Sequence, residues 1–171
     1  MLKEKVFWRS IIGFFAVSIL GTVNHYLYEW SGDNSFIGTF TPVNESVWEH
    51  LKLLFFPYLI FCIIEFIVYG KHIKGFLFSR LTGILYGLIF MPVAFYAYTS
   101  IIGKSILSLD ILIFIISVAL SFYISFNRIK NNKDTRYNMN IPAIIIFIGI
   151  ATLFIGFTFC PPQTEIFRSP V

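Results

Sequence analysis

Charged residues are scarce in this sequence, since Asp, Glu, Lys and Arg make up 13% of its 171 residues, about half the share found in soluble proteins. None of them occurs in residues 81–103 or 137–164, and Glu65 alone interrupts residues 53–70. A stretch of about 20 apolar residues is long enough to cross the hydrocarbon core of a membrane as a helix. The scarcity of charge therefore excludes a soluble enzyme and indicates a multi-pass membrane protein.

Cysteine is scarce too, because Cys62 and Cys160 are the only two, and this excludes a disulfide framework or a cysteine-based metal site. A glycine-rich phosphate-binding loop is also missing, so no nucleotide partner is expected. The net charge is +4, but the basic residues lie in short segments between apolar runs. Their expected partners are anionic head groups of membrane lipids, and nucleic acid is not an expected partner.

The apolar runs predict an all-α polytopic membrane protein, with a bundle of five transmembrane helices in a single domain, residues 1–171. The expected spans are about 9–30, 44–69, 76–102, 106–126 and 141–160. The period-2 alternation of membrane-barrel strands is absent from these runs. Backbone groups inside a bilayer must be hydrogen-bonded within their own segment, so the runs are expected to be helical.

The basic residues fall mainly on one side of these five spans, and this bias predicts the orientation of the chain. On the side of the N-terminus lie ten of the thirteen: Lys3, Lys5, Arg9, Lys71, Lys74, Arg80, Arg128, Lys130, Lys133 and Arg136. Because Lys and Arg favour the cytoplasmic side, the N-terminus is expected in the cytoplasm and the C-terminus outside. Toward the outer side lie six of the nine acids: Glu29, Asp33, Glu45, Glu49, Asp110 and Glu165.

Polar side chains gather at the outer ends of the first two predicted helices. On the first helix, His25 and Glu29 continue a polar stripe at helical spacing, and such a stripe in a membrane faces protein or water. The second helix begins with Asn44, Glu45, Glu49, His50 and Lys52. A connection of roughly a dozen residues lets the two helices be antiparallel neighbours, so these side chains are expected to converge in one outward-facing recess.

Imidazoles and carboxylates are the donors that zinc and iron take in proteins, so this cluster predicts a metal site. His25, Glu29 and His50 are the candidate ligands of a divalent metal such as Zn, and Glu45 or Glu49 is the candidate catalytic base. The HxxxE spacing of His25 and Glu29 is suggestive, but it is not a zinc signature. An enzyme at this place would be a metal-dependent hydrolase or transferase acting on a membrane lipid or lipid-linked group.

Two other interpretations fit the same residues. Glu45 and Glu49 suit the positive end of a helix dipole and Lys52 can pair with Glu49, as in a non-catalytic accessory or structural subunit. The outer acids could instead form the vestibule of a small proton or cation channel or transporter, with the intramembrane Glu65 as a second station. Glu65 also lies within three helical turns of Lys71 and Lys74, which could attract it.

Small residues recur on the third and fourth predicted helices, at Gly83 and Gly87 and at Ser117, Ser121 and Ser125. This spacing lets helix backbones approach closely. Packing within the chain is the expected use, and self-association through these faces is the alternative. The tail after Cys160 either hangs loose or folds back over the outer recess as a lid that brings Glu165 near His25 and His50.

The run Pro-Val-Asn-Glu-Ser-Val-Trp-Glu-His-Leu-Lys, residues 42–52, resembles the signature of an uncharacterised family of small multi-pass prokaryotic membrane proteins, known as a domain of unknown function. Residues 25–32 and the tail with Pro161 and Pro162 are similar to that family too, so the resemblance spans most of the chain. It implies a multi-pass protein of the prokaryotic cytoplasmic membrane, and it supplies no activity, substrate or cofactor.

Overall fold

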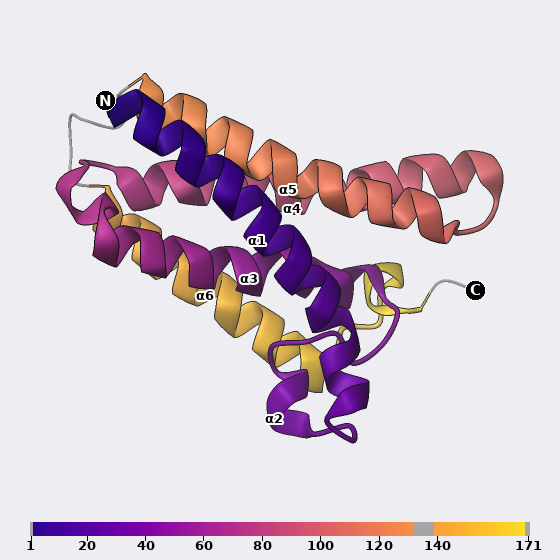
Figure 1. The fold of residues 1–171 in the computed structure, drawn as a ribbon. Coiled ribbons are helices and arrows are strands. Elements are labelled where there is room, and N and C mark those ends of the chain that lie inside the picture. Colours follow the sequence, from indigo (N-terminus) through magenta and orange to yellow (C-terminus); the bar gives the residue numbers. More distant parts are fainter. Residues whose placement is uncertain (1, 132–138, 170–171) are drawn as a thin grey trace.

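The computed structural model describes residues 2–131 and 139–169, which form helices and connecting segments without a strand (Figure 1). The long helices are α1 (Leu2–Trp30), α3 (Val47–Val68), α4 (Phe76–Ile102), α5 (Leu107–Lys130) and α6 (Asn140–Phe159). The short ones are α2 (Ser35–Gly38), η1 (Gly70–His72) and η2 (Glu165–Phe167). The five long helices are long and apolar enough to cross a membrane, so the predicted fold class with five spans is confirmed.

Three predicted helix boundaries differ from the structure. α1 begins at Leu2 rather than near residue 9, and α5 continues to Lys130 rather than ending near residue 126. Several of the polar residues that flank these apolar runs, Lys and Arg above all, are good helix formers, so the helices extend past the apolar segment. α3 begins at Val47 rather than near residue 44, because Ser46 is the N-cap of this helix. The Oγ of Ser46 accepts a hydrogen bond from the Glu49 backbone N–H at 3.3 Å.

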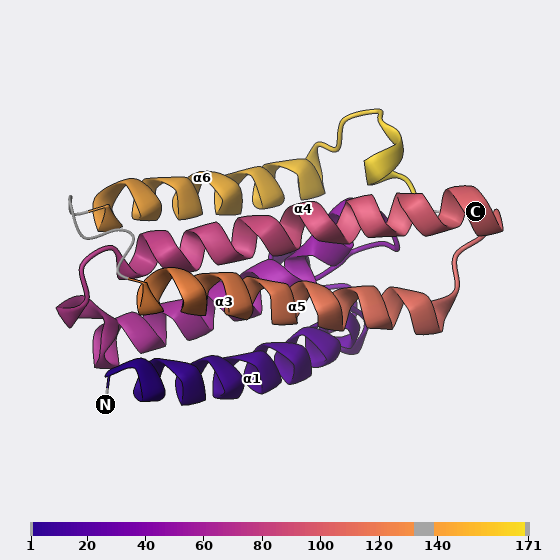
Figure 2. The same cartoon turned by 90° about the horizontal axis from the view of Figure 1, so that it is seen from above.

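The long helices lie side by side, and each runs antiparallel to the next long helix in the sequence (Figure 2). One end of the bundle holds the last residues of α1, α4 and α6 and the first residues of α3 and α5, together with α2 and η2. We call this the His50 end. The opposite end holds the N-terminus and the connection from α3 to α4. α1 packs against α3 and α5, while α4 packs against α3, α5 and α6.

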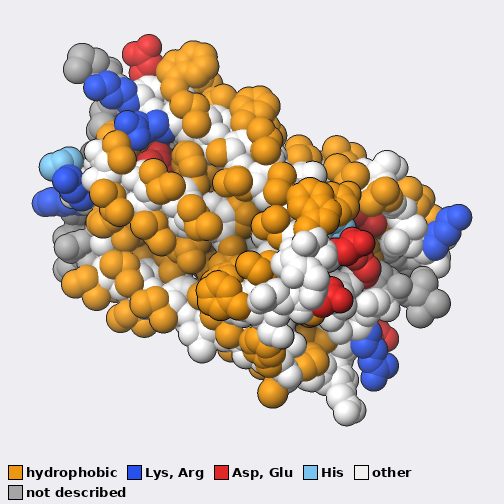
Figure 3. Space-filling model, turned by 60° about the horizontal axis from the view of Figure 1, so that its bottom comes forward, with side chains coloured by type: hydrophobic (Ala, Val, Ile, Leu, Met, Phe, Trp, Pro, Cys, Tyr) orange, Lys and Arg blue, Asp and Glu red, His pale blue; other side chains and the backbone are white. Residues whose placement is uncertain are grey.

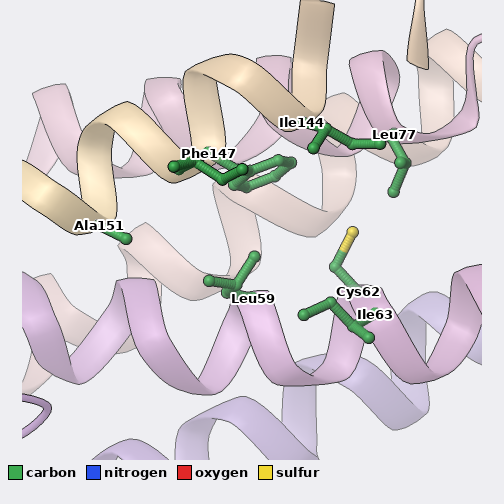
Figure 4. Close-up of a pocket in the computed structure, with 8 residues that line it drawn as sticks. Leu59, Cys62, Ile63, Leu77, Ile144, Phe147 and Ala151 are labelled. Carbon is green, nitrogen blue, oxygen red and sulfur yellow. The ribbon is translucent and has the colours of Figure 1, made fainter. Parts of the chain in front are cut away.

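Basic side chains gather at the opposite end, whereas the His50 end carries both acidic and basic side chains (Figure 3). The opposite end carries Lys5, Arg9, Lys71, Lys74, Arg128 and Lys130 together with Glu4, and the His50 end carries Glu29, Asp33, Glu45 and Asp110 together with Lys104 and Arg168. Between the ends, α1 and α6 expose many large apolar side chains, which suits contact with lipid tails. The side chain of Lys3 and the residues Lys133 and Arg136 lie outside the described residues.

The small residues of α4 and α5 face each other within the chain. A Cβ atom at Gly83 would overlap the backbone of Ser121, and one at Gly87 would lie 2.8 Å from the carbonyl oxygen of Ser117. The Ser121 hydroxyl donates to that same Ser117 carbonyl at 2.8 Å. Glycine is therefore required where these backbones touch, and packing within the chain is the use that the structure gives to these faces.

Glu65 is buried, and its partner is Arg80 of α4 rather than Lys71 or Lys74, which are exposed. Nη2 of Arg80 lies 2.8 Å from Oε1 and 2.7 Å from Oε2 of Glu65. Arg80 also donates through Nη1 to Ser125 Oγ at 2.7 Å. Arg80 therefore turns inward from the second turn of α4, because its side chain is 0% exposed and it neutralises the buried Glu65.

Candidate metal centre

α1, α3 and α5 meet at Gly21, and this contact positions the predicted site. A Cβ at Gly21 would lie 2.6 Å from the carbonyl oxygen of Leu53 and 2.5 Å from the ring of Phe114. One helical turn from this point toward the His50 end come His25 on α1 and His50 on α3. The backbone contact at Gly21 therefore brings the two histidines together, and their ring centroids are 5.3 Å apart.

Three side chains at this place could hold a metal ion. One ring nitrogen of His25, one of His50 and a carboxylate oxygen of Glu45 all lie within 4.8 Å of one another. Nε2 of His50 and Oε2 of Glu45 are 3.4 Å apart. Ligands at about 2.0–2.2 Å from a tetrahedral zinc ion are about 3.4 Å from each other, so this pair already has the required separation and the third donor is close to it.

The ring of His50 is oriented by its other nitrogen. Nδ1 lies 2.9 Å from the carbonyl oxygen of Ser46, which can only accept, so Nδ1 carries the proton in this contact. Nε2 is therefore left to face the Glu45 carboxylate, where it bears either a second proton or a metal ion. A histidine that donates one N–H to a backbone carbonyl is the usual arrangement around a protein-bound metal, because it fixes the tautomer and the ring plane.

His25 supplies the least satisfied atom of the group. Its Nδ1 is buried and has no hydrogen-bond partner among the residues that the structure describes. A buried polar atom without a partner costs free energy, so this nitrogen gains more than any other in the site from a proton donor or a bound cation.

Glu45 lies in the connection before α3, and its carboxylate is held in the charged form. A hydrogen bond from the His50 ring lowers the pKa of Glu45 below its ordinary value, the charges of His50 and His25 act in the same direction, and partial burial opposes them. Its side chain is 69% exposed, so water reaches the site from this side. The group thus combines two imidazoles with one ionised carboxylate that is open to solvent.

Glu49, the other predicted base, lies outside this group and is buried in contacts with three elements. Its Oε2 is 2.7 Å from Nζ of Lys52 and accepts from the backbone N–H of Val43 at 3.0 Å. Its Oε1 accepts from the hydroxyl of Thr158 on α6 at 3.1 Å. Both oxygens are therefore engaged, and Glu49 fastens α6 and the connection before α3 to the start of α3.

Lys52 adds further contacts between the start of α3 and the segment before it. Its ammonium, which is 0% exposed, donates to the carbonyl oxygens of Gly38 at 3.0 Å and Thr41 at 3.1 Å. Together with Glu49 these contacts use all three N–H groups of the ammonium. The buried pair therefore holds the segment from α2 to Thr41 against α3, and this segment leads directly to Glu45.

The remaining predicted site residues do not join the metal-capable group. Glu29 is exposed in the last turn of α1, and Glu45 supplies the carboxylate in its place. Asn44 accepts from the backbone N–H of Ser46 at 2.9 Å, which is a local turn before the N-cap of α3. Helical spacing pointed to Glu29 because it continues the stripe of His25, whereas the path of the connection that delivers Glu45 has no such periodic signal.

The tail after α6 folds back, but it does so over a different face of α3. Phe167 of η2 packs against Trp48 and Phe157, with ring centroids 4.9 Å and 5.4 Å apart. Trp48 also contacts Phe154 of α6 at 4.8 Å. Glu165 is not part of the metal-capable group, and its charge acts on Tyr96 of α4. The tail is thus anchored on an aromatic cluster beside the site.

No curated protein and no solved structure matches this chain. One family does match, and it covers residues 2–171. This range includes all five long helices, His25, Glu45 and His50. The chain therefore belongs to the family of unknown function DUF6512.

Proposed function

We propose that this protein is a metal-dependent membrane protein whose centre is formed by His25, Glu45 and His50. The observation that carries the proposal is the convergence of three donor atoms within 4.8 Å, from His25 on α1 and from Glu45 and His50 some twenty residues further along the chain. The Nδ1 contact of His50 with Ser46 supports it, because it presents Nε2 as a donor. Two imidazoles and one carboxylate suit zinc, which takes four ligands and leaves the fourth position to water in catalytic sites.

The chemistry that follows is hydrolysis or group transfer. A zinc ion lowers the pKa of its bound water to about 7 and so supplies hydroxide at neutral pH. The exposed side of Glu45 gives a substrate access to that position. Glu49 makes contacts that leave neither oxygen free for a proton, so we assign it to holding the site together rather than to the role of base.

The substrate class follows from the position of the site. The His50 end is where the five spans leave the apolar zone, so a group bound there lies at the depth of lipid head groups. In the orientation that the Lys and Arg bias favours, this end faces outside. We therefore propose a lipid head group or lipid-linked group at the outer surface of the cytoplasmic membrane as the substrate.

The transport alternative requires Glu65 to act as a second binding site for a proton or cation. Both oxygens of Glu65 contact Arg80, and this guanidinium is an always-charged partner that holds the carboxylate in place. No contact of the described residues favours a path from the His50 end to Glu65, so the metal centre is the function that we put forward.

Zinc analysis of the purified protein tests the proposal. We expect about one zinc per chain, and loss of most of it in His25→Ala and His50→Ala. His72→Ala is the matched control, because His72 is an exposed histidine at the opposite end and its loss should leave the zinc content unchanged. A wild-type protein that holds well below one equivalent, or histidine variants that bind like wild type, would overturn the proposed function.

A further inference from the structure

A third helix also reaches the metal centre. Phe114 of α5 touches the contact point at Gly21, and Asp110 lies one helical turn closer to the His50 end than Phe114. His25 on α1, His50 on α3 and Asp110 on α5 thus each lie about one helical turn from the same three-helix contact, on the side of the His50 end. Asp110 is not among the three donors within 4.8 Å, so it lies outside the first set of candidate ligands.

Asp110 is held in place by Tyr98 of α4. The Tyr98 hydroxyl donates to Oδ1 of Asp110 and accepts from the backbone N–H of Ile106 at 3.1 Å. The tyrosine therefore fixes one carboxylate oxygen, while Oδ2 has no hydrogen bond to any described residue. The side chain is half-buried, so this second oxygen is both positioned and available.

The charge of the centre calls for a second acid. A divalent ion with two neutral imidazoles and one carboxylate keeps a net charge of +1, and an uncompensated charge beside an apolar bundle is costly. Metal-bound groups in proteins are regularly oriented by hydrogen bonds to acids outside the first set of ligands. Asp110 is an acid that comes to this end of the bundle from α5, whereas Glu45 comes from the connection before α3.

We propose that Asp110 completes the metal centre from α5 as its charge-balancing acid, with Oδ2 accepting a hydrogen bond from the water on the metal. This inference rests on the proposed function, because it needs the metal. Tyr98 is then a positioning residue that acts through Asp110. The competing explanation is purely structural: an acid in the first turn of α5 suits the helix dipole, and its bond to Tyr98 ties α4 to α5.

Cobalt binding separates the two explanations. On the full-length protein in detergent, titration with Co²⁺ followed by visible absorption gives the affinity and the coordination spectrum of each variant. We expect Asp110→Asn to weaken Co²⁺ binding by about 10- to 100-fold and Tyr98→Phe to weaken it less, both with an altered spectrum. Asp33→Asn, an exposed acid at the same end, should bind like wild type.

The unfolding temperature of each metal-free variant completes the test. The proposal requires that Asp110→Asn unfolds within a few degrees of wild type without metal and differs in cobalt affinity. Unchanged affinity in Asp110→Asn, or a loss of affinity that is no larger than in Asp33→Asn, would overturn the role of Asp110 while leaving the centre itself intact. A wild-type protein that binds no Co²⁺ would overturn the proposed function, and with it this inference.

Discussion

Glu65 with Arg80 and the group of His25, Glu45 and His50 both place charged side chains in a protein that is otherwise apolar, but they differ in exposure and in how the charge of the acid is paired. Glu65 and Arg80 are 3% and 0% exposed, and both oxygens of the acid lie within 2.8 Å of an always-charged guanidinium. In the other group the acid faces a histidine, whose charge depends on pH, and the Glu45 side chain is 69% exposed. The first arrangement stabilises a fold, whereas the second is ready to bind.

Glu49 and Lys52 show that position along the bundle does not by itself separate a structural ion pair from the metal-capable group. They lie at the His50 end, within a turn of His50, yet they resemble Glu65 and Arg80 because a buried acid is paired with a buried base. Sequence spacing groups Glu49 with Glu45 and His50. Only the contacts and the burial show that Glu49 is structural and that Glu45 is exposed to solvent.

The largest effect is expected from breaking the Glu65–Arg80 pair. Arg80→Leu leaves a buried carboxylate without its partner, which costs about 3–5 kcal/mol of stability when a buried pair loses one member. Thermal unfolding in detergent measures the loss. The double variant Glu65→Leu with Arg80→Leu should recover most of it, since neither charge then remains unpaired. Equal stability of the single variant and wild type would contradict a structural role for the pair.

A smaller loss is expected at the His50 end from Lys52→Met. This change removes the ammonium that Glu49, Gly38 and Thr41 share, and the cost is about 2–3 kcal/mol, because Glu49 keeps its bonds to Val43 and Thr158. The segment from α2 to Thr41 should also become accessible to protease, as limited proteolysis followed by mass spectrometry would show. Unaltered cleavage would mean that the segment is held by other contacts.

Changes in the group of His25, Glu45 and His50 should have the opposite effect, on metal affinity rather than on stability. His50→Ala is expected to leave the unfolding temperature of the metal-free protein nearly unchanged but to weaken zinc binding by at least about 100-fold, since one of three ligands is lost. Competition with a zinc-binding dye gives the affinity. Destabilisation without any change in zinc affinity would place His50 with the structural residues and remove the contrast between the two groups.

The smallest effect concerns pH. The pKa of Glu45 is lowered by the hydrogen bond from His50, so its contribution to stability is complete above the ordinary range of a glutamate and is lost as pH falls through the lowered value. Between pH 7 and 3, the unfolding temperature of wild type should fall slightly more steeply than that of Glu45→Gln, because the exposed pair is weak. Glu29→Gln is the control, and profiles identical to wild type in both variants would contradict the role of Glu45.

The five spans could be predicted because absence of charge over about 20 residues is a requirement of the membrane itself. The pairing of Arg80 with Glu65 could not be predicted, because Arg80 lies at the border of a charge-free run, where an exposed and a buried side chain look alike in sequence. His25 and His50 could be found because they lie at matching depths on adjacent helices. The position of Glu45 beside them could not be predicted, because the fold of the connection depends on the contacts of Lys52 with Gly38 and Thr41.

X-ray absorption at the zinc edge of the purified wild-type protein tests the central claim most directly. The claim predicts zinc bound by nitrogen and oxygen at about 2.0–2.2 Å, with the scattering of two imidazole rings and no sulfur ligand. His25→Ala and His50→Ala should each remove one imidazole from that signal. A spectrum with sulfur ligands, or one with the same number of imidazoles in wild type and both variants, would contradict it.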